Sequence, residues 1–166
     1  MHNDWKAALR DAVERKDVQV LARIPKTDLH CHGLLSAPLD TYAALLGRPL
    51  PPPPAVFGDF RKFADYIVTN LLPALAGPEP VRTLIRAAFE RLLADGVVYA
   101  EMSFDLLVPE FVGLRAAEFA DLLQEECARV ADRLTVAPEI GIARGLPPDE
   151  VRPRLKDWLA TGACWA

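Results

Sequence analysis

A chain of 166 residues with a net charge of −4 has the length of a single domain and carries no basic stripe of the kind that binds nucleic acid. Hydrophobic residues make up 51% of it, but no apolar run reaches the roughly 18 residues that a membrane-spanning helix needs. The charged N-terminus contains no apolar signal-peptide core, so we expect a cytoplasmic protein without nucleic-acid or membrane partners. The three cysteines, Cys31, Cys127 and Cys164, are far apart and odd in number, as expected of reduced thiols.

The first predicted elements are an amphipathic helix over residues 4–16 and a short strand after Pro25. A helix is predicted over residues 39–46, and the proline-rich segment 47–54 predicts a stiff loop. Alternation along the strand predicts two faces, with Leu29 and Cys31 on one and Asp28, His30 and His32 on the other.

After the loop, apolar side chains recur at helical spacing, at Phe57, Phe60, Phe63, Ala64 and Ile67. We interpret this stripe as core packing rather than as a substrate lid, because the amphipathicity of a helix is enough to explain it.

The rest of the chain alternates between helices and largely apolar strands, which is typical of βα units and a parallel sheet. The predicted elements are a helix over 80–95, a strand over 97–104, a helix over 115–134, a strand over 135–143, a helix over 148–160 and the start of a fourth strand in the last residues. We predict an α/β fold, a partial (β/α)8 TIM-type barrel with its first three strands and the start of the fourth. Because a complete barrel takes roughly 250 residues, we interpret residues 1–166 as the N-terminal part of one barrel domain, truncated at its C-terminus.

His30 and His32 are the strongest candidates for a functional site. Residues i and i+2 of a strand project from the same face, so the two imidazoles can meet at one metal ion. Asp28, predicted on that face, could orient one of these ligands through a hydrogen bond. The alternative is a pair of histidines satisfied by hydrogen bonds at the end of a strand. A catalytic zinc site typically takes three protein ligands, and His2 is a poor candidate for the third, so the site is incomplete in this chain.

The segment IPKTDLHCH, residues 24–32, resembles the first strand of the adenosine deaminase family, whose signature is Pro-Lys, an acidic residue, Leu and H-x-H. The resemblance continues through FGDFRKFADYI, LADGVVYAEMSF and TVAPEIGIAR, similar in order to that family's helical segment near the site mouth and to its second and third barrel strands. It therefore covers almost the whole chain, as the N-terminal half of a family member.

The resemblance implies a metal-dependent hydrolase of the amidohydrolase type, in which water activated by Zn²⁺ replaces an amino group on a purine nucleoside or a related aminated heterocycle. It implies His30 and His32 as ligands of one divalent metal ion and a purine-nucleoside-like small molecule as the partner. The family's remaining ligands and catalytic residues have no counterpart here, so we expect the isolated chain to be inactive, and no catalytic residue is assigned.

Two departures from the family pattern concern the substrate. Family members that deaminate adenosine usually follow the second histidine with Leu, an acidic or amide residue and Gly, where this chain has Gly33, Leu34 and Leu35. The polar contact to the sugar would fall on Leu34, which cannot form a hydrogen bond. The family also commonly has Arg at the position of Ser103. Both departures make adenosine itself doubtful as the substrate.

Three further residues are candidates for the substrate side of the site. Gly33 directly follows the histidine pair, and Asp105 and Arg144 follow the second and third predicted strands, where they could reach a barrel mouth. A salt bridge is an equal alternative for Arg144. Glu101, within an apolar strand, should be paired or functional, and we favour a structural ion pair, for example with an arginine on a helix, over a functional role.

Two other functions stay open at this point. Metal-dependent phosphoesterases of the polymerase-and-histidinol-phosphatase type also begin with a DLHCH-like strand, but the preceding Pro-Lys and the long helical insert favour the deaminase. The third possibility is a non-catalytic fragment or interaction module.

Overall fold

A computed structural model of the chain describes residues 5–163. Three parallel strands form one sheet in the order β1-β2-β3, with β1 at Lys26–His32, β2 at Val97–Asp105 and β3 at Thr135–Gly141. This confirms the predicted α/β fold with parallel βα units. His2, Cys164 and the last residues of the predicted fourth strand lie outside the described residues.

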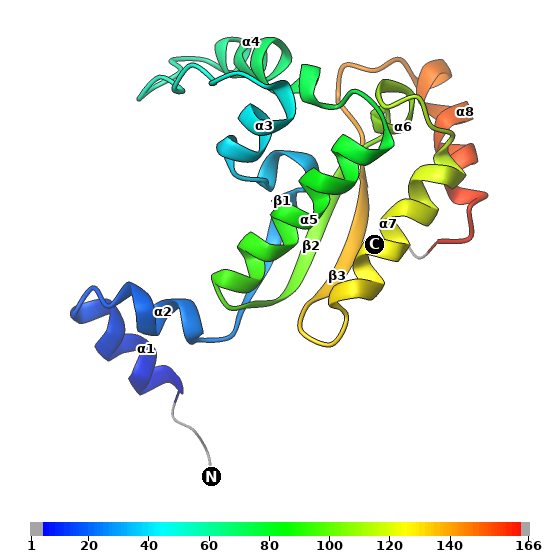
Figure 1. Cartoon of the computed structure of the whole chain (residues 1–166). Helices are drawn as coiled ribbons and strands as arrows, with labels where there is room; N and C mark the ends of the chain where they lie inside the picture. Colours follow the sequence, from blue (N-terminus) through cyan, green and yellow to red (C-terminus); the bar gives the residue numbers. More distant parts are fainter. Residues whose placement is uncertain (1–4, 164–166) are drawn as a thin grey trace.

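Two long helices, α5 (Pro78–Ala94) and α7 (Ala116–Val130), cover one face of the sheet, and α8 (Pro148–Leu159) packs beside α7 (Figure 1). The helices α1 (Trp5–Glu14) and α2 (Val18–Arg23) precede β1 and lie near the amino end of that strand. Within residues 5–163, no helix combines the length and apolar character needed to span a membrane.

The carboxyl ends of the strands meet a group of short elements (Figure 1). These are the 3-10 turns η1 (Gly33–Ser36) and η2 (Leu72–Ala74) and the helices α3 (Leu39–Leu46), α4 (Phe60–Asn70) and α6 (Val108–Phe111). The bounds of α3 match the predicted helix, because Pro38 precedes it and Gly47, at φ 61°, ends it in a left-handed conformation.

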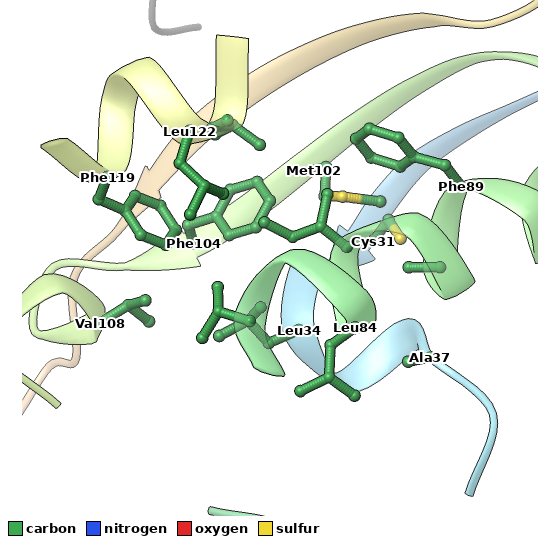
Figure 2. Packing of buried hydrophobic residues seen from close by; sticks show 14 of the residues in the cluster. Cys31, Leu34, Ala37, Leu84, Phe89, Met102, Phe104, Val108, Phe119 and Leu122 are labelled. Carbon is green, nitrogen blue, oxygen red and sulfur yellow. The ribbon is translucent and has the colours of Figure 1, made fainter. Parts of the chain in front are cut away.

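The core lies between the sheet and the helices α5 and α7. Alternate residues of β2 (Ala100, Met102 and Phe104) are buried, whereas the residues between them are only half-buried. Figure 2 shows Met102 and Phe104 among apolar side chains from both helices and from the segment after β1. One face of the sheet is therefore packed, and the other carries the polar positions of β2.

The two covering helices are also joined by an ion-pair cluster around Glu126, whose side chain is only 1% exposed. Its carboxylate accepts hydrogen bonds from Arg82 Nη1 at 2.6 Å and from Arg86 Nε and Nη2 at 2.8 and 2.9 Å. Burial alone raises the pKa of this carboxyl, but the bonds from Arg86 and Arg82 outweigh that effect and hold the pKa below its usual value.

A bulge interrupts the alternation of β1. Asp28 pairs with Ala100 and Cys31 with Met102, so β1 has one residue more than β2 between these pairs. The extra residue brings Leu29 to the open face of the sheet, where its side chain is 60% exposed. The prediction that Leu29 shares a buried face with Cys31 is therefore wrong.

The predicted core packing of the stripe after the proline-rich loop holds for Ile67, which packs against the core, but not for its aromatic residues. The ring of Phe60 is 79% exposed, and no residue of α4 is fully buried. Phe57 instead packs on Phe63 and Tyr66, with ring centroids 5.3 and 5.7 Å apart. The Tyr66 hydroxyl donates to the carbonyl oxygen of Pro51 at 2.8 Å and so fastens the proline-rich loop to α4.

Candidate functional site

His30 and His32 lie at the carboxyl end of β1 with their imidazole rings side by side. The ring centroids are 5.0 Å apart and the ring planes meet at 86°. Both side chains are exposed, and neither has a hydrogen-bond or ion-pair partner among residues 5–163. The two imidazoles are thus neighbours, and among residues 5–163 they are not hydrogen-bonded as the alternative predicted. Their role as metal ligands stays a prediction.

Asp28 lies on the other side of the strand. The bulge places it opposite Ala100, on the helix-covered side with Cys31, so the prediction that it shares the face of the histidines is wrong. Its Oδ1 instead accepts a hydrogen bond from the backbone N–H of His30 at 3.1 Å. Asp28 therefore contacts the backbone that carries His30, within the bulge, and not an imidazole.

A cleft of about 350 Å³ opens at the carboxyl ends of β1 and β2. The two strands contribute the polar lining residues His32, Ser103 and Asp105, and His32 pairs with Ser103 across the two strands. The remaining walls are contributed by the segment after β1 and by side chains of α3, α4, η2 and α6: Gly33, Leu34, Leu35, Tyr42, Ile67, Leu71, Leu72, Leu75, Phe104, Leu107, Val108 and Phe111.

Gly33 lines this cleft, and the close packing around it requires a glycine at this position. A Cβ atom at this position would lie 2.4 Å from Cε1 of Phe104, whose ring is buried in the core. Only glycine lets the backbone that follows His32 approach that ring, so the residue helps to set the direction in which the chain leaves the histidine pair.

Asp105 and Arg144 differ in their relation to the cleft. Asp105 lines it, and its Oδ1 accepts a hydrogen bond from the Leu107 N–H at 2.9 Å. Arg144 is exposed after β3, outside the cleft lining, and forms no ion pair within the described part of the chain. The structure therefore gathers His32, Gly33 and Asp105 in one cleft and leaves Arg144 outside it.

Among residues 5–163, Glu101 does not form the expected ion pair with a helix arginine. It lies on the open face of β2, where its Oε1 accepts a hydrogen bond from the Tyr99 hydroxyl at 3.3 Å. Desolvation and the charges of Glu101 and Glu139 raise the pKa of that hydroxyl. The open face of the sheet thus carries an acidic group beside the histidine strand.

The sequence interpretation missed most of the apolar walls of the cleft. The signal was present in part, because Ile67, Leu71 and Leu75 continue the helical stripe at intervals of four residues. Tyr42 carried no such signal. It is buried, its hydroxyl donates to the carbonyl oxygen of Leu34, and burial raises its pKa to about 12.

The histidine pair supplies only part of a metal site. Among residues 5–163, no group of three or more His, Cys, Asp or Glu side chains is placed to hold one ion. Two neighbouring imidazoles fit a zinc ion chemically, but a catalytic zinc site typically takes three protein ligands.

Comparisons with known proteins give a fold and no close relative. No protein-family model matches the chain, and no curated protein matches it. Among solved structures, an adenine deaminase from Arthrobacter aurescens matches with a TM-score of 0.70 at 22% identity, over 84% of this chain and 46% of that one. An amidohydrolase from Burkholderia ambifaria, crystallised with bound Zn, matches with a TM-score of 0.57 at 16% identity, over 86% and 51%.

The chain thus spans about half the length of these solved structures, and at such identities the likeness concerns the fold. Three parallel strands with flanking helices have the fold of a partial TIM-type barrel. The comparisons do not single out the adenosine deaminase family.

Proposed function

We propose that this chain carries the histidine pair and one substrate-binding wall of a zinc-dependent hydrolytic deaminase acting on a purine nucleoside or a related aminated heterocycle. The placement of His30 and His32, with ring centroids 5.0 Å apart at the carboxyl end of β1, carries the proposal. The fold likeness to an adenine deaminase and to an amidohydrolase with bound Zn supports it. Active sites of such barrels lie at the carboxyl ends of the strands.

A zinc ion at such a site supplies a hydroxide at neutral pH by lowering the pKa of a bound water. The residues of this chain would hold that ion through the two imidazoles and place the substrate against it. Ser103 and Asp105 lie at the same end of the cleft as His32, where they can hydrogen-bond polar atoms of a heterocycle. The apolar walls would keep bulk water away from the other end of the bound molecule.

The phosphoesterase alternative finds less support in the cleft. A phosphorylated substrate calls for arginine, lysine or an equivalent cluster of donors. No lysine or arginine lines the cleft within residues 5–163. A neutral heterocycle therefore suits these walls better than a phosphate ester.

The ligand assignment is tested by zinc affinity, measured by competition with a chelating dye. We expect His30→Ala and His32→Ala each to weaken zinc binding at least about tenfold, as loss of a ligand should. The third histidine gives a matched control, because His2→Ala should leave the affinity unchanged. If both strand variants bind zinc as the wild type does, the assignment is wrong.

The same protein tests how much of the site is present. With two ligands in the described residues, the wild-type chain should bind zinc weakly and release no ammonia from adenine or adenosine. Ammonia release that depends on added zinc would contradict the inference that the site is incomplete.

A further inference from the structure

The side chains that line the cleft outside β1 and β2 are almost all hydrocarbon. Leu34 lies in the wall, and its carbonyl oxygen already accepts the Tyr42 hydroxyl. Tyr42 also lines the cleft, with its hydroxyl proton committed to that carbonyl. The remaining side chains away from the two strands are hydrocarbon, from Leu35, Ile67, Leu71, Leu72, Leu75, Leu107, Val108 and Phe111. A hydroxyl group buried among them would lose its water partners without gaining others.

Apart from Tyr42, the polar side chains of the cleft lining come from the carboxyl ends of β1 and β2. The Ser103 hydroxyl has no hydrogen-bond partner among residues 5–163, and Asp105 uses one carboxylate oxygen for the Leu107 N–H. These two side chains can meet the amino group and ring nitrogens of a heterocycle. The cleft therefore has one end for a polar ring and a body for an apolar group.

We propose that the substrate is an aminated heteroaromatic ring whose substituent is apolar and compact, rather than a ribosylated ring. This inference rests on the proposed deaminase function and narrows its substrate class. A ribose in the body of the cleft would place its hydroxyls against Leu34, Leu71 and Leu75. A volume of about 350 Å³ lies at the small end of small-molecule sites and suits one ring system with a compact substituent.

Two probes separate the apolar substituent from the sugar. 9-Cyclopentyladenine and adenosine carry the same base and a five-membered ring at the same nitrogen, but only adenosine has the hydroxyls. Dissociation constants are measured by NMR titration of the complete 166-residue chain in a buffer with a chelator, so that zinc plays no part. We expect the cyclopentyl compound to bind at least about tenfold tighter, the discrimination typical of one apolar pocket.

Variants on α4 then locate the preference in the cleft. Ile67→Asn puts an amide into the wall and should reduce the affinity ratio of the two probes at least about threefold. Val68→Asn is the matched control, because Val68 is the exposed neighbour on the same helix and does not line the cleft. Leu107→Asn makes the same test from the β2 side, in case Ile67→Asn fails to fold.

The outcomes separate this inference from the proposed function. Equal affinities of the two probes, or no detectable binding of either, would overturn the apolar-substituent inference. Zinc binding through His30 and His32 would be untouched by that result, because it is measured without either probe. Conversely, the cyclopentyl compound could bind much more tightly while zinc affinity is unchanged in both His30→Ala and His32→Ala. That result would refute the metal assignment and leave the apolar-substituent inference standing.

Discussion

Replacing Glu126 by glutamine tests whether the buried ion-pair cluster holds α5 and α7 together. The substitution keeps the size of the side chain and one acceptor oxygen, but it removes the charge that faces Arg82 and Arg86. Breaking a buried ion pair costs about 3–5 kcal/mol when the partner is left without water. Here the side chains of Arg82 and Arg86 are 20% and 42% exposed and can be partly hydrated, so we expect a loss of about 2–3 kcal/mol.

The neighbouring residue provides the control. Glu125 also accepts a hydrogen bond from Arg82 Nη1, at 2.8 Å, but its side chain is 64% exposed. Exposed ion pairs contribute about 0–1 kcal/mol, so Glu125→Gln should cost less than about 1 kcal/mol. Urea denaturation followed by circular dichroism at pH 7 gives both values. Equal losses for the two variants would refute the reasoning from burial.

The stability difference between wild type and Glu126→Gln should also depend on pH, in a direction set by the pKa of Glu126. The pKa of Glu126 is lower in the folded chain than in the unfolded chain. Its contribution is therefore complete above the unfolded-state value of about 4.3 and is lost as the pH falls through the folded-state pKa. The difference between wild type and Glu126→Gln should shrink below about pH 4. A difference that is as large at pH 3 as at pH 7 would contradict the assignment.

Two further predictions concern the cleft wall and a half-buried thiol. Gly33→Ala should destabilise the chain by about 1–3 kcal/mol in urea denaturation, because its Cβ would overlap the Phe104 ring, whereas Gly145→Ala, with no atom within 4 Å of the added Cβ, should have little effect. Burial, with the charge of Glu126, raises the pKa of the Cys127 thiol to about 11, so iodoacetamide should alkylate it at pH 8 at least roughly 100-fold more slowly than N-acetylcysteine, as followed by peptide mass. Equal costs at the two glycines, or equal alkylation rates, would contradict these two predictions.

Apolar content and periodicity were enough to predict the existence of the strands and of the covering helices. The apolar residues Val81, Leu84, Ile85 and Ala88 recur at helical intervals and are all fully buried in α5. The same reasoning failed for Phe60 and Phe63 of α4, where a helical stripe of aromatic residues stays exposed. A periodic pattern shows that one side of a helix is apolar, but whether that side is covered depends on elements elsewhere in the chain.

At the candidate site, too, a periodic pattern predicted some side-chain positions and failed for others. The H-x-H spacing predicts two imidazoles on one face, and the 5.0 Å separation of the rings agrees because both residues lie at or after the bulge. Asp28 lies before the bulge, so the same count of alternate residues places it on the wrong side. The bulge exists because β1 pairs with β2 in two different registers, at Asp28–Ala100 and at Cys31–Met102. No local pattern in residues 26–32 records that pairing. The hydrogen bond from the His30 N–H to Asp28 Oδ1 lies within this irregular segment. Asp28, which was predicted to orient an imidazole, therefore contacts the backbone instead, at the position where the alternation changes.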